Sequence, residues 1–422
     1  MDCTRGLYAS GVAVLRKALI VAGAIIGAGI LLIIAFLAFR AWTTNAHESS
    51  LAAFYATPED FSQIPGTLLR WEPLGVDVAD AKEYRLLYVT EDQQGKPAVA
   101  AGMAFIPDTK PDTPRPMVAF LQGTTGQGDA CAPSRSSDPL YEIQSFLPEA
   151  MAQGWAVVAP DEYGVGTQGV QLYLIKDQEV HDTVNSIRAL RALPNALTGN
   201  DFAVYGYSQG GHSALWTGHL SKQFAPELDL VGVAAAAPAA DLTSIIDRQW
   251  DSVVGWGIGA DVTRSWSIAY PDLPVNPFLT DAARDNFERI AESCTFGSFI
   301  EGTVRHDIFR QDFFADNPAN NPLWAQALIE QTPPPYSAAL PIMLVQGTAD
   351  QIVLAGPNAN LQESWCAAGS TFNALWLEGV DHIGVADLAV PAVAGWIADR
   401  FAGLTAPNTC SVPPPWSLIT VE

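Results

Sequence analysis

Short apolar segments, each bounded by Gly, Pro or Asp, recur along the chain and alternate with stretches of helix length. Segments of this kind are typical of strands that are buried on both faces, as in a parallel sheet. The predicted strands span residues 84–90, 99–106, 117–121, 155–160, 202–206, 230–237, 341–347 and 371–377. Residues 179–193 and 210–224 have the length of helices and lie between predicted strands. The alternation predicts an α/β fold with a mostly parallel sheet and helices on both sides.

Two regions depart from this alternation. Residues 51–75 contain three prolines and are expected to be irregular. Residues 241–335 follow a predicted strand, but they are rich in Trp and Phe and too long for a simple crossover. We interpret them as a mainly helical cap, inserted over the carboxyl edge of the sheet where open α/β folds bind ligands. The two parts of the core are then expected at 51–240 and 336–422.

The first 50 residues are of a different kind. Residues 18–39 carry no charged side chain, and a helix over this segment would span about 33 Å, enough for the hydrocarbon core of a bilayer. Basic residues precede it, which places the body of the protein outside the cytoplasm. We predict a cytoplasmic segment at 1–17, a transmembrane signal-anchor helix at 18–39 and a linker at 40–50. Cleavage after Ala46 is the alternative and would give a secreted protein.

The charge of the chain argues against one class of partner. The sequence has 45 acidic and 22 basic residues, a formal net charge of −23. The first 40 residues contain four basic residues and one acidic residue, so the remainder carries −26. Such a surface repels phosphate backbones, and we expect no nucleic-acid partner. The sequence predicts no protein partner either.

Four cysteines follow the apolar segment, namely Cys131, Cys294, Cys366 and Cys410. In an exported domain they favour two disulfides, and three pairings are open. They do not suggest zinc, because no CxxC occurs and no histidine lies within a few residues of them. The chain also lacks GxGxxG after a strand, GxxxxGK[ST] and HExxH. We expect neither a cofactor nor a metal ion.

Residues 206–210 read Gly-Tyr-Ser-Gln-Gly, a G-x-S-x-G pattern that stands between a predicted strand and a predicted helix. This context is typical of a nucleophile elbow, in which a strained turn exposes the serine hydroxyl above the sheet. Glycines flank the serine because side chains at their positions would collide with the neighbouring backbone. We predict that Ser208 is a catalytic nucleophile. A solvent-exposed turn serine is the alternative.

A serine nucleophile needs a base, and in this fold class the chain order is Ser, then Asp or Glu, then His. The other histidines precede Ser208, lie on the helix after it or fall in the predicted cap, which leaves His382 as the base. Asp350 follows a predicted strand and would accept the Nδ1 proton of His382. Asp381 and Glu378 are the alternative acids.

Acyl transfer also requires hydrogen-bond donors for the oxyanion. The backbone N–H of Gln209, the residue after the nucleophile, is one predicted donor. The second is expected from the loop after the strand at 117–121, which reads Gln-Gly-Thr-Thr-Gly from residue 122. Either Gly123 or Thr124 could donate.

Several segments resemble the secretory lipase family of the lipase A type, found in fungi and actinobacteria. They are FYATPEDF at 54–61, PGTLLR at 65–70, CAPS at 131–134, GWAVVAPDEYGVG at 154–166, YGYSQGGHSALW at 205–216 and QGTADQIV at 346–353. The resemblance covers about residues 51–405. It implies an α/β-hydrolase fold with an inserted lid, and a Ser208–Asp350–His382 triad that acts on carboxylic esters.

The same resemblance implies the disulfides Cys131–Cys294 and Cys366–Cys410. It also has a departure: residues 161–163 read Asp-Glu-Tyr here, where the fungal members have Asp-Tyr-Glu, so no role is transferred to Glu162. The long apolar segment at 18–39 is a second departure, because a cleaved signal would be usual.

These observations predict a serine carboxylic-ester hydrolase, either a lipase or an esterase, that acts on a small-molecule or lipid ester through an acyl-enzyme. It would be anchored in a membrane with the catalytic domain outside the cytoplasm, or secreted if the N-terminal helix is cleaved. The alternative from another class is a non-catalytic, membrane-anchored binding protein on a hydrolase scaffold. Peptidase, thioesterase and acyltransferase activities share the same serine chemistry and stay open.

Overall fold

The structure is a computed structural model that describes residues 47 and 49–419. The predicted cytoplasmic segment (1–17), the predicted signal-anchor helix (18–39) and most of the predicted linker (40–50) lie outside these residues. Among the described residues, no helix combines the length and the apolar character needed to cross a membrane. One compact unit begins at Phe54 and contains every strand described below.

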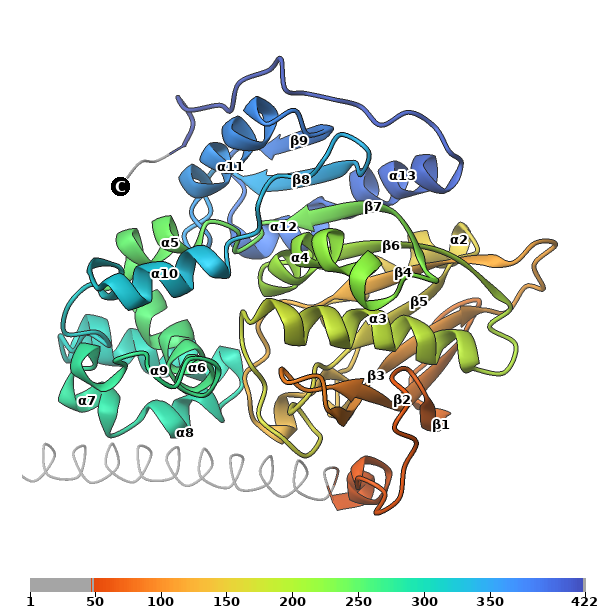
Figure 1. The fold of residues 1–422 in the computed structure, drawn as a ribbon, viewed down its shortest axis with the longest axis horizontal. Helices are drawn as coiled ribbons and strands as arrows, with labels where there is room; N and C mark the ends of the chain where they lie inside the picture. The colour runs from red at the N-terminus through yellow and green to blue at the C-terminus, as the bar shows by residue number, and fades with distance from the viewer. Residues whose placement is uncertain (1–46, 48, 420–422) are drawn as a thin grey trace, which may run out of the picture. The chain divides into compact units, whose positions relative to one another are not determined.

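A nine-stranded sheet is the framework of this unit (Figure 1). Its strands are β1 (Leu68–Pro73), β2 (Ala81–Glu91), β3 (Pro97–Pro107), β4 (Arg115–Leu121), β5 (Ala156–Pro160), β6 (Thr198–Tyr207), β7 (Asp229–Ala236), β8 (Ile342–Gly347) and β9 (Phe372–Leu377). They are arranged in the order β1-β2-β3-β5-β4-β6-β7-β8-β9. Pairs from β5 onward are parallel, and the pairs among β1, β2, β3 and β5 are antiparallel. The mostly parallel sheet predicted from the alternation is confirmed.

The expectation of irregular structure over residues 51–75 is wrong for its last part. Leu68–Pro73 forms β1, which pairs antiparallel with β2 at the edge of the sheet and has a register shift near its start. An edge strand tolerates a proline at its end because the missing N–H is not needed there. Most of its residues are only partly buried, so it lacks the apolar run that marks the central strands.

Two layers of helices cover the sheet. On one face lie α3 (Lys176–Ala192), α4 (Gln209–Phe224) and α11 (Ala355–Ala367), and on the other lie α2 (Leu147–Ala152), α12 (His382–Leu388) and α13 (Val390–Phe401). Alternate residues of a strand enter the two cores, as along β4, where Met117 packs in the first core and Val118 in the second.

Between β7 and β8 the chain forms a separate set of helices, which Figure 1 shows in green and cyan beside the sheet. They are α5 (Leu242–Gln249), α6 (Val253–Ala269), α7 (Asp281–Arg284), α8 (Phe287–Ala291), α9 (Thr295–Thr303) and α10 (Pro322–Glu330). Their aromatic side chains form a core of their own, with Trp256, Trp266 and Trp324 fully buried. We call these helices the inserted helices. They occupy the interval 241–335 for which the sequence predicts a cap.

Candidate active site

Ser208 stands at the turn between β6 and α4, with φ 56° and ψ −117°. This is a strained conformation for a residue with a side chain. A Cβ on Gly206 would come within 1.8 Å of the Gly210 carbonyl oxygen, and one on Gly210 within 1.9 Å of the Leu121 carbonyl oxygen. Only glycine fits at either position, as expected from the collision that side chains would cause there. The Ser208 N–H donates to the carbonyl of Ala236, which ties the turn to β7.

The side chains of Ser208, His382 and Asp350 form one line of hydrogen bonds. His382 Nε2 lies 3.0 Å from Ser208 Oγ, and His382 Nδ1 lies 2.7 Å from Asp350 Oδ2. Asp350 follows β8, and His382 is the first residue of α12. All three residues are at least nine-tenths buried. Since a carboxylate only accepts, Nδ1 carries the proton in this contact, and Nε2 is left free to accept the serine proton.

Further hydrogen bonds hold the acid and the imidazole in place. Asp350 Oδ1 accepts from the backbone N–H groups of Ile352 and Val353, each at 2.9 Å. Asp350 Oδ2 also accepts from Gln346 Nε2 at 3.2 Å. The Tyr207 hydroxyl donates to the His382 carbonyl at 2.9 Å. The carboxylate is therefore oriented by its own loop before it meets the histidine.

The two alternative acids are not part of this line. Asp381 Oδ1 accepts from the Gly384 N–H at 2.8 Å and caps the N-terminus of α12. Glu378 lies exposed in the preceding loop. The structure therefore brings Asp350, and neither Asp381 nor Glu378, to His382.

The other buried histidine near the nucleophile, His212, contacts Glu179 and not the serine. Its Nδ1 lies 2.6 Å from Glu179 Oε2, and its Nε2 lies 2.7 Å from the Gln331 carbonyl. His219 bonds the Pro334 carbonyl in a similar way. Over residues 47 and 49–419, no group of three or more His, Cys, Asp and Glu side chains is placed to hold a metal ion.

The predicted oxyanion donors differ in what their N–H groups contact. Gln209 is the first residue of α4, so its N–H has no acceptor within the helix. The Gly123 N–H donates to Glu142 Oε2 at 2.7 Å. Among described residues the Thr124 N–H has no acceptor, and its hydroxyl bonds the Tyr173 hydroxyl at 2.8 Å. Of the two candidates on this loop, the geometry favours Thr124.

Glu142 was not singled out by the sequence, because it lies in an irregular segment far from any motif. Burial raises the pKa of its carboxyl to about 7, although the hydrogen bond from Gly123 opposes that shift. A Cβ on Gly123 would come within 2.8 Å of Glu142 Oε1. Close approach of this carboxyl therefore explains why the loop has a glycine at that position.

The inserted helices are bonded directly to this loop. Thr295, the first residue of α9, donates its N–H to the Thr125 carbonyl at 3.0 Å and its hydroxyl to the Thr124 carbonyl at 2.7 Å. A disulfide joins Cys131 to Cys294, the residue before Thr295. A second disulfide joins Cys366 to Cys410. Both pairings that the resemblance implied are confirmed.

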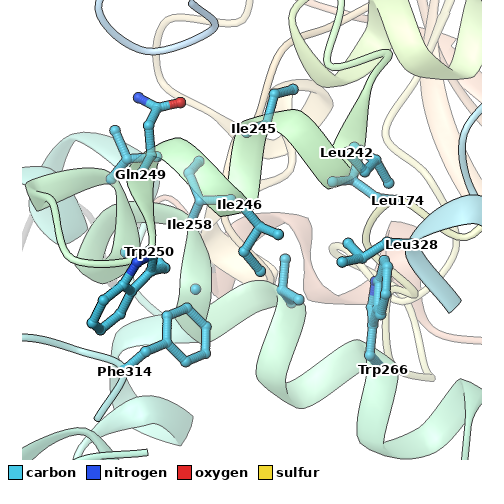
Figure 2. A pocket seen from close by; sticks show the side chains of 14 residues that line it. Leu174, Leu242, Ile245, Ile246, Gln249, Trp250, Ile258, Trp266, Phe314 and Leu328 are labelled. Carbon is cyan, nitrogen blue, oxygen red and sulfur yellow. The ribbon is translucent and has the colours of Figure 1, made fainter. Parts of the chain in front are cut away.

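A cavity lies among the inserted helices, and none of the residues that line it is charged (Figure 2). It encloses about 530 Å³. Its walls include Leu174, Leu242, Ile246, Ile258, Phe314 and Leu328. We call it the apolar cavity.

The apolar cavity is connected to the active-site loops through two of its lining residues. Gln249 Nε2 donates to the carbonyl of Gln351, the residue after Asp350, at 3.1 Å. Leu174 follows Tyr173, which bonds Thr124.

A second space lies behind the nucleophile turn and has the opposite character. It encloses about 350 Å³, and its lining includes Gln122, Gly123, Glu162, Glu179 and Gln209. We call it the polar pocket. The sequence did not predict it, because its residues come from four separate segments.

Comparisons with known proteins agree with this geometry. The family model described as secretory lipase matches residues 141–409. Lipase 6 of Candida albicans is 26% identical over 396 residues, which is 85% of this chain and 82% of that protein. A probable inactive lipase of Mycobacterium tuberculosis is 24% identical over 376 residues, 83% of this chain and 82% of that protein. The solved structure of Candida antarctica lipase A has a TM-score of 0.69 at 21% identity, over 86% of this chain and 88% of that one.

Proposed function

The chain belongs to the secretory lipase family and is an ester hydrolase with the α/β-hydrolase fold, and we propose that Ser208, His382 and Asp350 carry out the hydrolysis. All three residues lie within the matched range 141–409. The observation that carries the proposal is the line of hydrogen bonds from Ser208 Oγ through the imidazole to Asp350.

In the proposed reaction, Ser208 Oγ attacks the ester carbonyl and its proton passes to His382 Nε2. Asp350 stabilises the imidazolium, and the N–H groups of Gln209 and Thr124 bond the oxyanion. The C–O bond then breaks, His382 returns the proton to the leaving alcohol, and an acyl-enzyme remains. Water, which gives a proton to His382, releases the acid and restores the Ser208 hydroxyl.

The apolar cavity supports substrates with an apolar acyl chain. It lies among the inserted helices, and its walls are connected to the acid loop through Gln249 and to Tyr173 through Leu174. An acyl chain gains about 0.8 kcal/mol for each methylene group that leaves water. We therefore assign residues 241–335 as the cap that binds the acyl chain, and a lipid or other apolar ester as the substrate.

We further propose that the catalytic domain is exported. The two disulfides support this, because such bonds persist in oxidising compartments. Anchoring by residues 18–39 is the finer form of the proposal, and secretion after cleavage is its alternative. Fractionation of cells that express the full chain distinguishes them, since an anchored enzyme stays with the membranes after a salt wash.

The variant Ser208→Ala tests the catalytic assignment. It should lower kcat/KM on p-nitrophenyl butyrate by about 10³-fold or more and leave the melting temperature close to the parent value. Hydrolysis at the parent rate by this variant would refute the assignment.

A matched labelling experiment separates the enzyme from the non-catalytic binding protein. One relative is named a probable inactive lipase, so a scaffold without activity is a real alternative. A fluorophosphonate should label the parent chain and not Ser208→Ala, because only an activated serine reacts. An unlabelled parent chain would favour the binding protein.

A further inference from the structure

Glu162 places a carboxyl group behind the nucleophile turn, and the reaction proposed above does not use it. Its Oε2 and Oε1 lie 2.9 and 3.2 Å from Gln209 Nε2, which donates to both. Gln171 Nε2 donates to the same carboxyl. Gln209 is the residue whose backbone N–H is the proposed oxyanion donor. One side chain therefore connects the loop after β5 to the start of α4.

The backbone of Glu162 is held in an unfavourable conformation. Its φ is 68°, in the left-handed region that residues with a side chain rarely adopt and that costs about 1–2 kcal/mol. Both neighbours are anchored: Asp161 Oδ1 accepts from the Ser134 N–H at 3.0 Å, and the Tyr163 N–H donates to Asp182 Oδ2 at 2.7 Å. Such strain persists only where the surroundings impose it. Here these contacts direct the Glu162 carboxyl at Gln209.

The position of this carboxyl also suits a role beside the oxyanion. Glu162 lines the polar pocket together with Gln209 and Gly123, so it lies between the two loops that supply the proposed donors. Burial raises the pKa of Glu162 well above its ordinary range, and the nearby charge of Glu179 raises it further. Glu162 therefore keeps its proton to a higher pH than an ordinary glutamate, which limits the negative charge behind the oxyanion.

We propose that Glu162 is a positioning residue for ester hydrolysis, which holds the Gln209 side chain and so orients the Gln209 backbone N–H toward the oxyanion. The inference rests on the proposed function. The bond from Gln209 N–H to the oxyanion is strongest in the transition state, so its misalignment lowers kcat more than it changes KM.

Two substitutions at Glu162 test the inference with p-nitrophenyl butyrate as substrate. Glu162→Ala should lower kcat about 10–100-fold and leave KM within about twofold. Glu162→Gln keeps an acceptor oxygen for Gln209 and should stay within about threefold of the parent kcat. Glu227→Ala is the matched control, because it removes a glutamate that bonds Arg188 at 2.7 Å on the surface, and it should behave as the parent.

A double-mutant cycle keeps the test decisive if Glu162→Ala is unstable. Gln209→Ala removes the same hydrogen bond from its other end and keeps the backbone N–H. The doubly substituted chain should be about as slow as the slower single variant, because both lose one shared contact. Fully additive losses of kcat would overturn the inference.

Two further outcomes would overturn it. One is an unchanged kcat in Glu162→Ala. The other is a parallel loss of kcat and melting temperature in both Glu162 variants, which would show a purely structural role. A parent chain that neither hydrolyses the ester nor reacts with a fluorophosphonate would refute the proposed function and this inference together. An active parent with an unchanged Glu162→Ala would refute the inference alone.

Discussion

The polar pocket and the apolar cavity are both parts of one domain, but their chemistry is opposite. The polar pocket is built from the ends of β4 and β5 and from α3 and α4, and it contains buried carboxyl groups. The apolar cavity is built from the inserted helices, and its lining has no charged residue.

The difference arises because each kind of group has its own requirements when it leaves water. A buried carboxyl must find hydrogen-bond donors, which loops at strand ends and helix N-termini provide in defined positions. Apolar side chains need only close packing, so the shape of their cavity can vary at a small cost. We conclude that the polar side of the molecule serves the chemistry, whereas the inserted helices select the substrate.

Substitution of the acid should have the largest effect on this division. Asp350→Asn removes the carboxylate that holds the His382 tautomer and should lower kcat by about 10³–10⁴-fold. Asp381→Asn is the matched control, because Asp381 caps α12; it should cost about 1 kcal/mol of stability and leave kcat close to the parent value. Steady-state kinetics on p-nitrophenyl butyrate check both. An equal loss in the two variants would undermine the choice of Asp350.

Filling the apolar cavity should alter selectivity and leave the chemistry unchanged. Ile246→Trp occupies space that a long acyl chain would use, so kcat/KM for a p-nitrophenyl dodecanoate should fall about 10–100-fold. The value for the acetate should stay near the parent. Ile329→Trp, on the exposed surface of α10, is the control and should change neither. A uniform loss across acyl lengths would refute the assignment of this cavity to the acyl chain.

The two disulfides should differ in their effect on activity. Replacing Cys131 and Cys294 by serine frees α9 from the loop that carries Thr124, and kcat should fall about tenfold as the donor loses its alignment. Replacing Cys366 and Cys410 should lower the melting temperature but leave kcat near the parent. Each pair is measured by thermal unfolding and kinetics on one short ester. Equal losses of kcat would remove the distinction between the two bonds.

The smallest expected effect is a dependence of stability on pH that arises from the polar side. Burial raises the pKa of Asp161 to about 6 and that of Asp182 to about 7, against about 4 in an unfolded chain. The folded protein therefore binds more protons than the unfolded chain between these values. The stability contribution is fully present below about pH 4 and is lost as the pH rises through 6 to 7.

Denaturant unfolding at pH 5 and pH 8 measures this dependence. The free energy of unfolding should be lower at pH 8 by about 1–3 kcal/mol. Asp182→Asn should flatten the difference, because the amide does not titrate. Stability that rises over this interval would contradict the direction of both shifts.

Much of the framework could be predicted because it depends on short windows of sequence. The central strands are apolar on both faces, and the glycines at 206 and 210 are required by a local collision, so each is visible within a few residues. The edge strand β1 was missed because its half-buried residues have no such pattern. The roles of Glu142 and Glu162 were missed for a related reason, since neither belongs to a motif with a known function.

The sequence by itself determined the alternation of strands and helices, the elbow around Ser208 and the chain order that singles out His382 and Asp350. Only the tertiary structure decided which groups meet: His382 and Ser208 are 174 positions apart along the chain, and Cys131 and Cys294 are 163 apart. It also decided that the Gly123 N–H bonds Glu142, which leaves Thr124 as the second donor. The physical reason is that dihedral preferences and turn sterics act between near neighbours, whereas hydrogen bonds across the fold depend on how the packed layers bring distant segments together.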